Sequence, residues 1–431
     1  MKKSIIAVIF VLVLFSCGNS ESSLTIPDGK LDPCTLRFSW WGGDDRHEAT
    51  LEAVELWHKI HPEIKIKSEY GGWDGWAEKV NTQISSATEP DIIQINYDWL
   101  VTLSADGKGF YDLGSLSDFI DLSAFEDDVL SFGMVDGRLN AITVSVSGRG
   151  LFYNSEVFER LGVGYPTTWE SLMETGRIFE KYGKYPIDLD VQSGSTAWYL
   201  AVVYVQQKTG RDFIDMDGNL CFSADDIKSA LDFYRELEEK HVIRTVRTRI
   251  DEDGNTALYQ SPEFINGNIA GVLEWGSAVG KYADVLPENA LVAGDFLTDG
   301  NGSSGGWFIK PSLMYAVSAK TKYPDECACF IDFLLNDEKC ADILGTSRGI
   351  PASSRAEKRL AETGRLSGLV RQNDEMLENL ETVTVSPYME LARVKQFCND
   401  ALEKVSYGVA DTRSTAQELH RNITDYLESL K

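Results

Sequence analysis

The sequence predicts an α/β protein with a mainly parallel sheet. Three stretches, TLRFSW, EIKIKSEY and PDIIQI, have the alternating or short apolar pattern of strands. Between them, HEATLEAVELWHKIHP and EKVNTQISSAT have the pattern of helices, and the first of these has an apolar face that includes Val54, Trp57 and Ile60. Strands that alternate with helices in this way form a parallel sheet covered by helices on both faces.

The rest of the chain continues to alternate between extended and helical patterns. Extended segments are predicted around 141–146 and 150–153, and helices over much of 193–240. The segment 291–318 has an extended, glycine-rich pattern, and 351–431 is largely helical by pattern. No internal repeat is evident, so we expect domains of different structure and not a repeated unit.

The composition is that of an acidic globular protein. The chain has 431 residues, enough for two or three domains, with a formal net charge of -26. A surface of this charge repels phosphate groups, which excludes nucleic acid and anionic membrane surfaces as expected partners. We expect a monomer.

The N-terminus has the pattern of an export signal. Lys2 and Lys3 precede an apolar run at 5–15, which is shorter than the roughly 20 residues that span a bilayer. The run ends in LFSC, which resembles a bacterial lipoprotein box with Phe15 where a small residue is preferred. We therefore predict a signal peptide over 1–16, lipidation of Cys17 and a membrane-tethering segment over 17–32. An ordinary cleaved signal with an incidental cysteine is the alternative.

Cysteine, histidine and glycine patterns give no sign of a metal or cofactor. Six cysteines follow Cys17 and leave disulfide pairing open, while Cys327 and Cys329 lie in an amphipathic helical pattern and are predicted core residues. No CxxC or HxxxH spacing occurs, so no metal site is predicted. GNGSSG at 300–305 is followed by an extended pattern, which indicates a loop and not a dinucleotide site. We predict no cofactor.

Three loops follow the three predicted strands and are rich in tryptophan, glycine and carboxylates. They are WWGGDDR, GGWDGW and NYDW. Ligands of open α/β sheets bind beyond the carboxyl ends of the strands. These loops therefore mark the expected ligand-binding edge.

An ordered set of segments resembles a known family. WGGDDRHEATLEAVELWHKIHPEIKIKSEYGGW, EPDIIQI, VDGRLNAI, LFYNSEVFERLGVGYPTTWESL, FINGNIAGVLEW and SRGIPAS occur in this order over nearly the whole mature chain. They are similar to extracellular solute-binding proteins of family 1, which serve carbohydrate ABC transporters and include maltose-binding protein. The resemblance implies a type II periplasmic-binding-protein fold, with two α/β lobes built from discontinuous segments and a ligand cleft between them.

Mapped onto this chain, the resemblance places the first lobe at 33–142 and 295–345. The second lobe would hold 150–290 and 350–431. The crossings between the lobes would lie near 143–150 and near 310.

A sugar site pairs aromatic rings, which stack on C–H faces, with polar side chains that bond hydroxyls. The resemblance and the loop positions give ten candidate ligand-binding residues: Trp41, Asp44, Arg46, Trp73, Asp98, Trp99, Arg149, Trp198, Trp275 and Trp307. Asp98 has a second interpretation as a helix cap, and Asp44 with Arg46 as a solvated pair at a helix start. Arg149 departs from the maltose-binding pattern and is suited to a uronate or sulfate, to two neutral hydroxyls, or to a hinge salt bridge.

The sequence thus predicts a lipid-anchored, extracytoplasmic protein that captures a carbohydrate, preferably an oligosaccharide, and delivers it to ABC permease subunits. The lipid would be its sole membrane attachment. No nucleophile elbow, zincin helix or Walker loop occurs, so we predict no enzyme. An exported glycoside hydrolase or lyase, and a sugar-sensing partner of a membrane kinase, are the alternatives.

Overall fold

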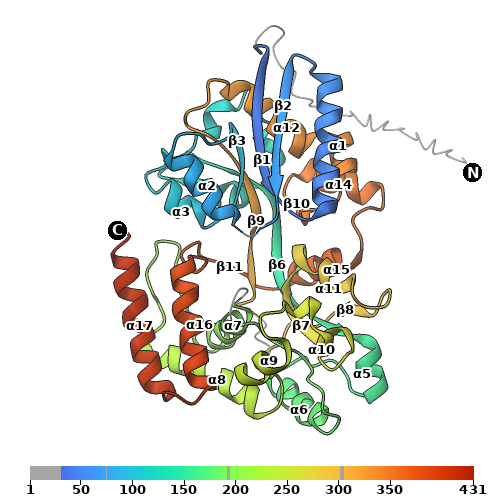
Figure 1. The fold of residues 1–431 in the computed structure, drawn as a ribbon, viewed down its shortest axis with the longest axis vertical. Helices are drawn as coiled ribbons and strands as arrows, with labels where there is room; N and C mark the ends of the chain where they lie inside the picture. Colours follow the sequence, from blue (N-terminus) through green and yellow to red (C-terminus); the bar gives the residue numbers. More distant parts are fainter. Residues whose placement is uncertain (1–30, 74, 192–194, 301–304) are drawn as a thin grey trace, which may run out of the picture.

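A computed structural model describes residues 31–73, 75–191, 195–300 and 305–431, which form two lobes of mixed α/β structure (Figure 1). The predicted signal peptide, Cys17 and most of the predicted tether lie outside these ranges. No helix within the ranges is long and apolar enough to cross a membrane.

The first lobe is built on the predicted sheet. β1 (Cys34–Trp41) pairs in parallel with β2 (Ile64–Gly71) and with β3 (Ile92–Ile95). β3 then pairs antiparallel with β9 (Phe308–Val317), and β9 with β6 (Ile142–Asn154). All four residues of β3 are buried, as its continuous apolar pattern predicts. Loops after β1, β2 and β3 consequently lie at one edge, facing the second lobe (Figure 1).

Helices cover this sheet and supply its core. Trp57 is 1% exposed and packs against Phe330 and Phe333, and its indole N–H donates to the Ile64 carbonyl at 3.2 Å. Cys327 and Cys329 are buried, which confirms their prediction as core residues, and the six cysteines of the described residues are free. The first-lobe elements besides the sheet are α1 (Asp44–Ile60), α2 (Trp76–Ser85), α3 (Trp99–Leu103), α4 (Asp127–Ser131), β4 (Met134–Val135), β5 (Arg138–Leu139), α12 (Pro324–Asn336), α13 (Glu338–Leu344), β10 (Ile350–Pro351) and α14 (Ser354–Glu362).

The second lobe is mostly helical around a short sheet. α7 (Thr196–Thr209) runs through its centre with ten buried residues, and α8, α16 and α17 pack together at one side (Figure 1). Its remaining elements are α5 (Ser155–Leu161), α6 (Trp169–Glu180), α8 (Ala224–Glu239), α9 (Val246–Asp253), α10 (Pro262–Ile265), β7 (Gly271–Trp275), α11 (Gly280–Ala283), β8 (Leu291–Ala293), α15 (Gly368–Leu377), β11 (Val383–Thr384), α16 (Ala392–Ser406) and α17 (Thr412–Glu428).

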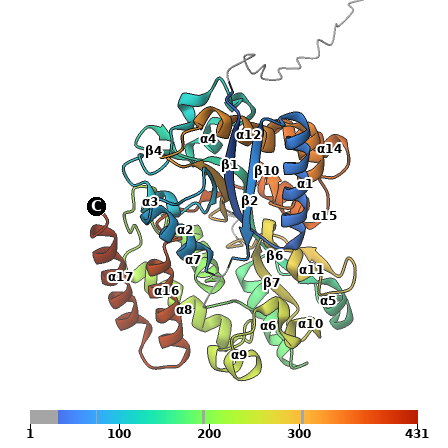
Figure 2. The ribbon, with the colours of Figure 1, turned by 45° about the horizontal axis from the view of Figure 1, so that its top comes forward.

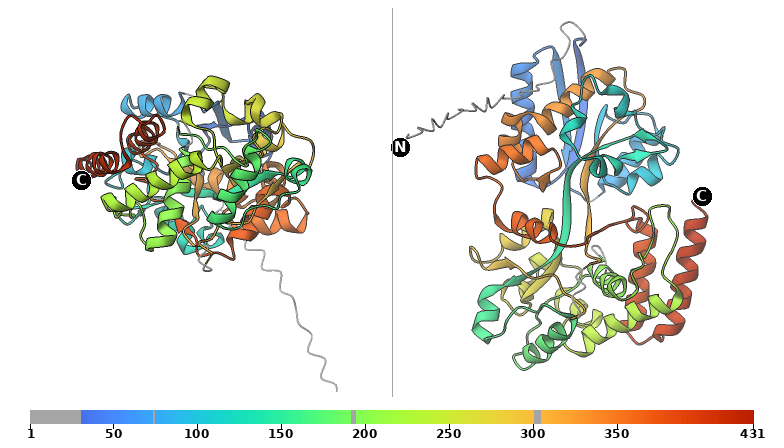
Figure 3. Two further views of the ribbon diagram at one scale, coloured as in Figure 1. Left: turned by 90° about the horizontal axis from the view of Figure 1, so that it is seen from below. Right: turned by 180° about the vertical axis from the view of Figure 1, so that it is seen from behind.

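Strands β6 and β9 belong to both lobes. The two extended segments predicted around 141–153 form the single strand β6, whose first half pairs with β9 and whose second half pairs with β7 and β8. A third connection follows α14 and passes to α15, which lies against β6 between the lobes (Figure 3). The junction is therefore formed by strands that are fixed in both sheets.

The contacts divide the chain differently from the sequence-based division at two places. α14 packs on α12 and α13, although 350–431 was assigned to the second lobe, so we place the third connection after residue 362. Phe296 and Trp307 pack in the second-lobe core, although 295–345 was assigned to the first lobe. The physical reason is that β9 begins beside β11 of the second lobe and pairs with β3 only further along.

Close packing of α15 on β6 makes Gly148 a sensitive position. A Cβ at Gly148 would lie 1.8 Å from the Leu377 Cδ1 atom, whereas a Cβ at Gly164 would meet nothing within 4 Å. Overpacking costs about 1–3 kcal/mol, so Gly148→Ala should lower the melting temperature clearly and Gly164→Ala should leave it nearly unchanged. Equal melting curves for the two variants would show that α15 is not held closely on the strand.

Candidate functional site

Three predicted tryptophans meet at the junction edge of the first lobe. The Trp41 ring centroid lies 5.2 Å from that of Trp73 and 5.5 Å from that of Trp99, and the Trp73 and Trp99 rings are stacked at 6.3 Å. Trp41 and Trp99 are nearly buried, whereas Trp73 is 50% exposed. They come from the end of β1, the loop after β2 and the start of α3, so the order of the strands in the sheet brings them together. Trp73 offers an open ring face to a ligand.

Asp98 lies beside this aromatic surface and close to charges of the second lobe. It begins α3 but makes no side-chain cap hydrogen bond, and instead accepts a hydrogen bond from the Asn96 amide at 2.5 Å. Burial raises the pKa of Asp98 to about 6, while Lys395 and Lys310 lower it and Glu390 raises it. Asp98 therefore does not make the hydrogen bond that a helix cap requires, and its carboxyl group lies between the lobes.

Arg149 lies where β6 enters the second lobe, held between two aromatic rings. Its guanidinium carbon is 4.1 Å from the Tyr199 ring centroid and 4.4 Å from that of Trp275, its partner in the β6–β7 register. The residue is 4% exposed, yet its Nε and Nη1 have no hydrogen-bond partner. Burial lowers the pKa of Arg149, and nearby Glu274 and Glu390 raise it.

Lys310, on β9, places a second buried cation next to Arg149. Its ammonium group pairs with Glu390 and lies 4.8 Å from the Trp275 ring centroid. Burial, with the charges of Lys395 and Arg149, holds the pKa of Lys310 well below its usual range. The basic groups of Arg149 and Lys310 thus both lie close to the Trp275 ring.

Glu390 is the carboxylate that holds this group together. It accepts a hydrogen bond from the Tyr199 hydroxyl, pairs with Lys310, and lies 3.6 Å from the Lys395 ammonium group. Figures 1 and 2 show that α7 and α16 of the second lobe, which carry Tyr199 and Lys395, face α2 and α3 of the first lobe. The sequence-based list omitted all four residues. Of the four, only Lys310 could have been singled out from the sequence, because a crossing between the lobes was predicted near 310.

Asp44 and Arg46 differ in exposure and in hydrogen bonding. Asp44 is exposed in the first turn of α1. Arg46 donates from Nε and Nη2 to the Ser347 carbonyl at 3.2 and 3.1 Å, and from Nη1 to the Trp41 carbonyl at 3.3 Å. Burial, with nearby Arg348, lowers the pKa of Arg46 to about 10. Arg46 therefore ties the end of β1 to the loop after α13.

Trp198 and Trp307 are core residues, which corrects their prediction as ligand contacts. Trp198 is 2% exposed and packs edge-on against Phe213 at 5.3 Å. Trp307 is fully buried, stacks on Trp169 at 6.3 Å, and donates its indole N–H to a main-chain carbonyl at 3.3 Å. Because α7 is buried on nearly all sides, the sequence does not reveal that Tyr199, next to Trp198, is the residue that reaches the junction.

Among the residues that the structure describes, no group of three or more His, Cys, Asp or Glu side chains is arranged to hold a metal ion. The junction instead offers aromatic faces, hydrogen-bond donors and a few carboxylates. This combination suits a polar ligand with both apolar faces and anionic or hydroxyl groups.

Comparisons with known proteins agree with this arrangement. The model of the family described as bacterial extracellular solute-binding protein matches residues 52–363. A periplasmic oligogalacturonide binding protein from Yersinia enterocolitica, solved with saturated digalacturonic acid, is 33% identical, with a TM-score of 0.85 over 92% of this chain and 99% of its own. A periplasmic solute binding protein from Pectobacterium atrosepticum is 31% identical, with a TM-score of 0.87 and the same coverages.

Curated relatives match over shorter stretches. The arabinooligosaccharide-binding protein of Bacillus subtilis is 25% identical over 66% of this chain and 64% of its own length. Putative binding proteins of Brucella are 23% identical over 43% of this chain and match over 45% of their own length. The family and these relatives are binding proteins.

The raised pKa of Asp98 gives a pH test. Because the folded protein binds this proton more tightly than the unfolded chain, whose aspartates titrate near 3.9, stability falls as pH rises from about 4 through 6. Asp98→Asn should remove that part of the decrease, measured as melting temperature against pH. Asp374, whose pKa burial also raises to about 6, is the matched control: Asp374→Asn should change the pH profile but not ligand affinity. Identical profiles for Asp98→Asn and the unsubstituted protein would contradict a raised pKa for Asp98 in the folded protein.

Proposed function

We propose, from the premise that the chain belongs to the family of bacterial extracellular solute-binding proteins, that it captures an acidic oligosaccharide at the lobe junction. The ligand class would be oligosaccharides that contain uronate. The protein would then deliver the bound sugar to the permease subunits of an ABC transporter. The relative solved with digalacturonic acid supports this choice of ligand class.

The observation that carries the proposal is the state of Arg149. A guanidinium that is 4% exposed has lost most of its hydration, and two of its nitrogens have no hydrogen-bond partner. Buried donors left without partners cost about 1–3 kcal/mol, and more when they are charged. A ligand carboxylate would supply a bidentate acceptor in the planar geometry that guanidinium favours.

The neighbouring residues fit the rest of a sugar ring. Trp275 already stacks on Arg149 and remains partly exposed, so it is suited to pack against the C–H face of the sugar whose carboxylate Arg149 binds. Trp73 would receive a second ring from the first lobe. Asp98 and Lys395 would bond hydroxyls or a carboxylate from opposite sides of the junction.

Binding would favour closure of the two lobes. The proposed contacts come from the first lobe, through Trp73 and Asp98, and from the second lobe, through Arg149 and Trp275. A ligand that touches both lobes is bound more tightly when they are closed, and it stabilises the closed state by this difference in affinity. The permease would recognise the closed form.

Binding without catalysis is part of the proposal. A glycosidase needs two carboxyl groups that flank the scissile bond, one of them available as an acid. Here the Glu390 carboxylate is engaged by Tyr199 and Lys310, and Glu274 is paired with Lys281 at 2.9 Å. We further propose that Cys17 carries a lipid that anchors the protein, as a monomer, on the outer side of the cell membrane.

Substitution of Arg149 tests the ligand class. Removing one partner of a buried charge pair costs about 2–5 kcal/mol, or roughly 30-fold or more in affinity. Arg149→Gln should therefore lose at least ~30-fold in affinity for tri- and digalacturonate by calorimetric titration. The affinity of Arg149→Lys should fall between those of Arg149→Gln and the unsubstituted protein. Arg393, which is exposed and stacks on Phe397 at 4.4 Å, provides the control Arg393→Gln, with expected unchanged affinity.

Product analysis of the same mixtures completes this test. The intact oligosaccharide should be recovered after prolonged incubation. Cleavage of the sugar by the purified protein would contradict a binding role, and full affinity in Arg149→Gln would contradict the carboxylate site.

A further inference from the structure

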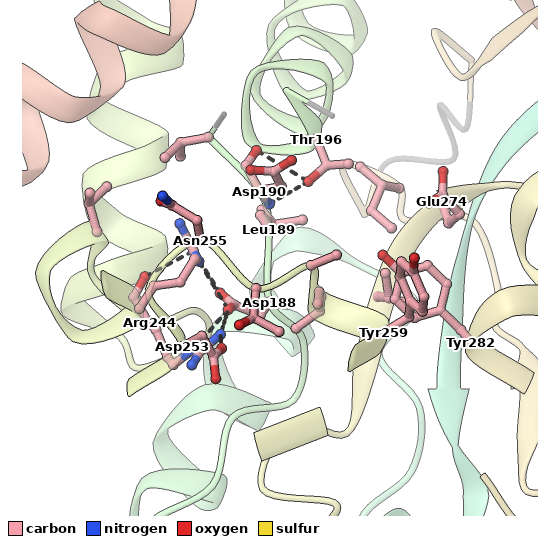
Figure 4. A pocket seen from close by; sticks show the side chains of 18 of the residues that line it. Asp188, Leu189, Asp190, Thr196, Arg244, Asp253, Asn255, Tyr259, Glu274 and Tyr282 are labelled. Atoms are coloured by element: carbon pink, nitrogen blue, oxygen red, sulfur yellow. Dashed lines mark hydrogen bonds and ion pairs between the residues drawn. The ribbon is translucent and has the colours of Figure 1, made fainter. Parts of the chain in front are cut away.

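The second lobe contains a cavity of about 250 Å³ beside Arg149 that the carboxylate site does not use (Figure 4). It lies between residues 188–191, the loop after α9 and helix α11. Glu274 forms its wall on the junction side. This residue pairs with Gly150 in the β6–β7 register, so it is a direct neighbour of both Arg149 and Trp275. Burial lowers the pKa of Arg149 and the charge of Glu274 raises it, so this wall of the cavity lies within electrostatic range of the Arg149 guanidinium.

Two tyrosine rings form one wall of the cavity. Tyr259 and Tyr282 lie side by side, with ring centroids 5.9 Å apart in an edge-to-face arrangement (Figure 4). The Lys281 ammonium group lies 5.6 and 5.3 Å from these two ring centroids. The wall thus presents aromatic surface together with hydroxyl groups, which is the combination that sugar rings require.

The cationic groups on the opposite wall are already paired with carboxylates. Arg244 pairs with Asp188 at 2.7 Å and with Asp253 at 2.7 Å (Figure 4). Arg249 pairs with the same Asp188 at 2.8 Å. Arg244 also donates from Nη1 to Glu252 at 3.0 Å. Arg244 Nη2 contacts the two carboxylates as an ion pair without a hydrogen bond, and Arg249 Nη1 has no hydrogen-bond partner.

The remaining wall cation, Lys281, pairs with Glu274 at 2.9 Å. Four carboxylates therefore surround the cavity against three cations, which gives a formal charge of −1. The members of this set are Asp188, Asp190, Asp253 and Glu274, with Arg244, Arg249 and Lys281. A second carboxylate brought into this cavity would meet net negative charge, and each of the three cations there is already ion-paired with a carboxylate.

We propose that this cavity is a subsite for one uncharged sugar ring, so that the ligand is a mixed oligosaccharide in which a uronate at Arg149 adjoins a neutral sugar. This inference rests on the proposed function. The hydroxyl groups of the neutral ring would donate to the wall carboxylates, and the ring itself would pack on Tyr259 and Tyr282.

The size of the cavity supports a single ring. Its volume of about 250 Å³ is below the roughly 300–1,000 Å³ of pockets for drug-sized ligands. A longer neutral chain would have to leave the cavity again. The subsite therefore selects one sugar position and does not enclose the whole ligand.

The test compares four ligands by calorimetric titration of the full mature protein: galacturonosyl-rhamnose, glucuronosyl-xylose, digalacturonate and galacturonate. The expected result is that at least one mixed disaccharide binds ~10-fold or more tightly than both digalacturonate and the monosaccharide. Mixed disaccharides that bind no better than digalacturonate would overturn the inference.

Two variants test whether the higher affinity for a mixed disaccharide arises in the cavity. Ala257 lines the cavity and is exposed, so Ala257→Trp should fill it and reduce mixed-disaccharide affinity to the level of galacturonate. Tyr259→Ala, which removes one ring of the wall, should weaken the mixed ligand ~10-fold. The control Val409→Trp, at a position that is 76% exposed and does not line the cavity, should bind as the unsubstituted protein does. Unchanged affinity in both cavity variants would overturn the inference.

The outcomes separate this inference from the proposed function. If digalacturonate binds best and Arg149→Gln alone abolishes binding, the carboxylate site stands and the neutral subsite falls. If none of the four ligands binds, both fall together.

Discussion

Arg149 and Lys310 are two buried cations on the strands that cross between the lobes. Each needs compensating groups, and the other junction residues are placed around this need. Moving a charged group out of water costs several kcal/mol unless other groups compensate. Lys310 is compensated by Glu390, which Tyr199 and Lys395 also hold. Arg149 receives two aromatic faces but too few acceptors, and its Nε and Nη1 have none. Two buried donors of Arg149 are therefore left without acceptors, and this is the observation on which the proposed carboxylate site depends.

These cations lie where the two lobes are joined. β6 and β9 belong to the sheets of both lobes, so side chains at their crossing lie between the lobes. Burial raises the pKa of Asp98 on the first lobe, and the charge of Lys395 on the second lobe lowers it, so the two side chains interact across the junction. A Cβ at Gly148 of β6 would overlap Leu377, so α15 is packed closely on this crossing strand.

Sequence patterns predicted the sheet and much of the junction, and the misses have a physical cause. Trp41, Trp73, Trp99 and Asp98 follow successive parallel strands, so local pattern places them at one edge. From the sequence, Trp198 and Trp307 could not be distinguished from the tryptophans at the junction. Trp198 lies on α7, which is buried on nearly every side, so its sequence has no periodicity that separates core residues from junction residues. Tyr199, Glu390 and Lys395 approach Lys310 only through tertiary packing, which spacing along the chain does not encode.

The most direct measurement of the central claim is the affinity of the unsubstituted protein for digalacturonate and for the same disaccharide with both carboxyl groups reduced to alcohols. The two ligands share ring stereochemistry and linkage and differ only in the groups that Arg149 would bind. The predicted result is a loss of at least ~30-fold on reduction, as expected when a buried guanidinium loses its anionic partner. Equal or tighter binding of the reduced sugar would show that Arg149 serves another purpose.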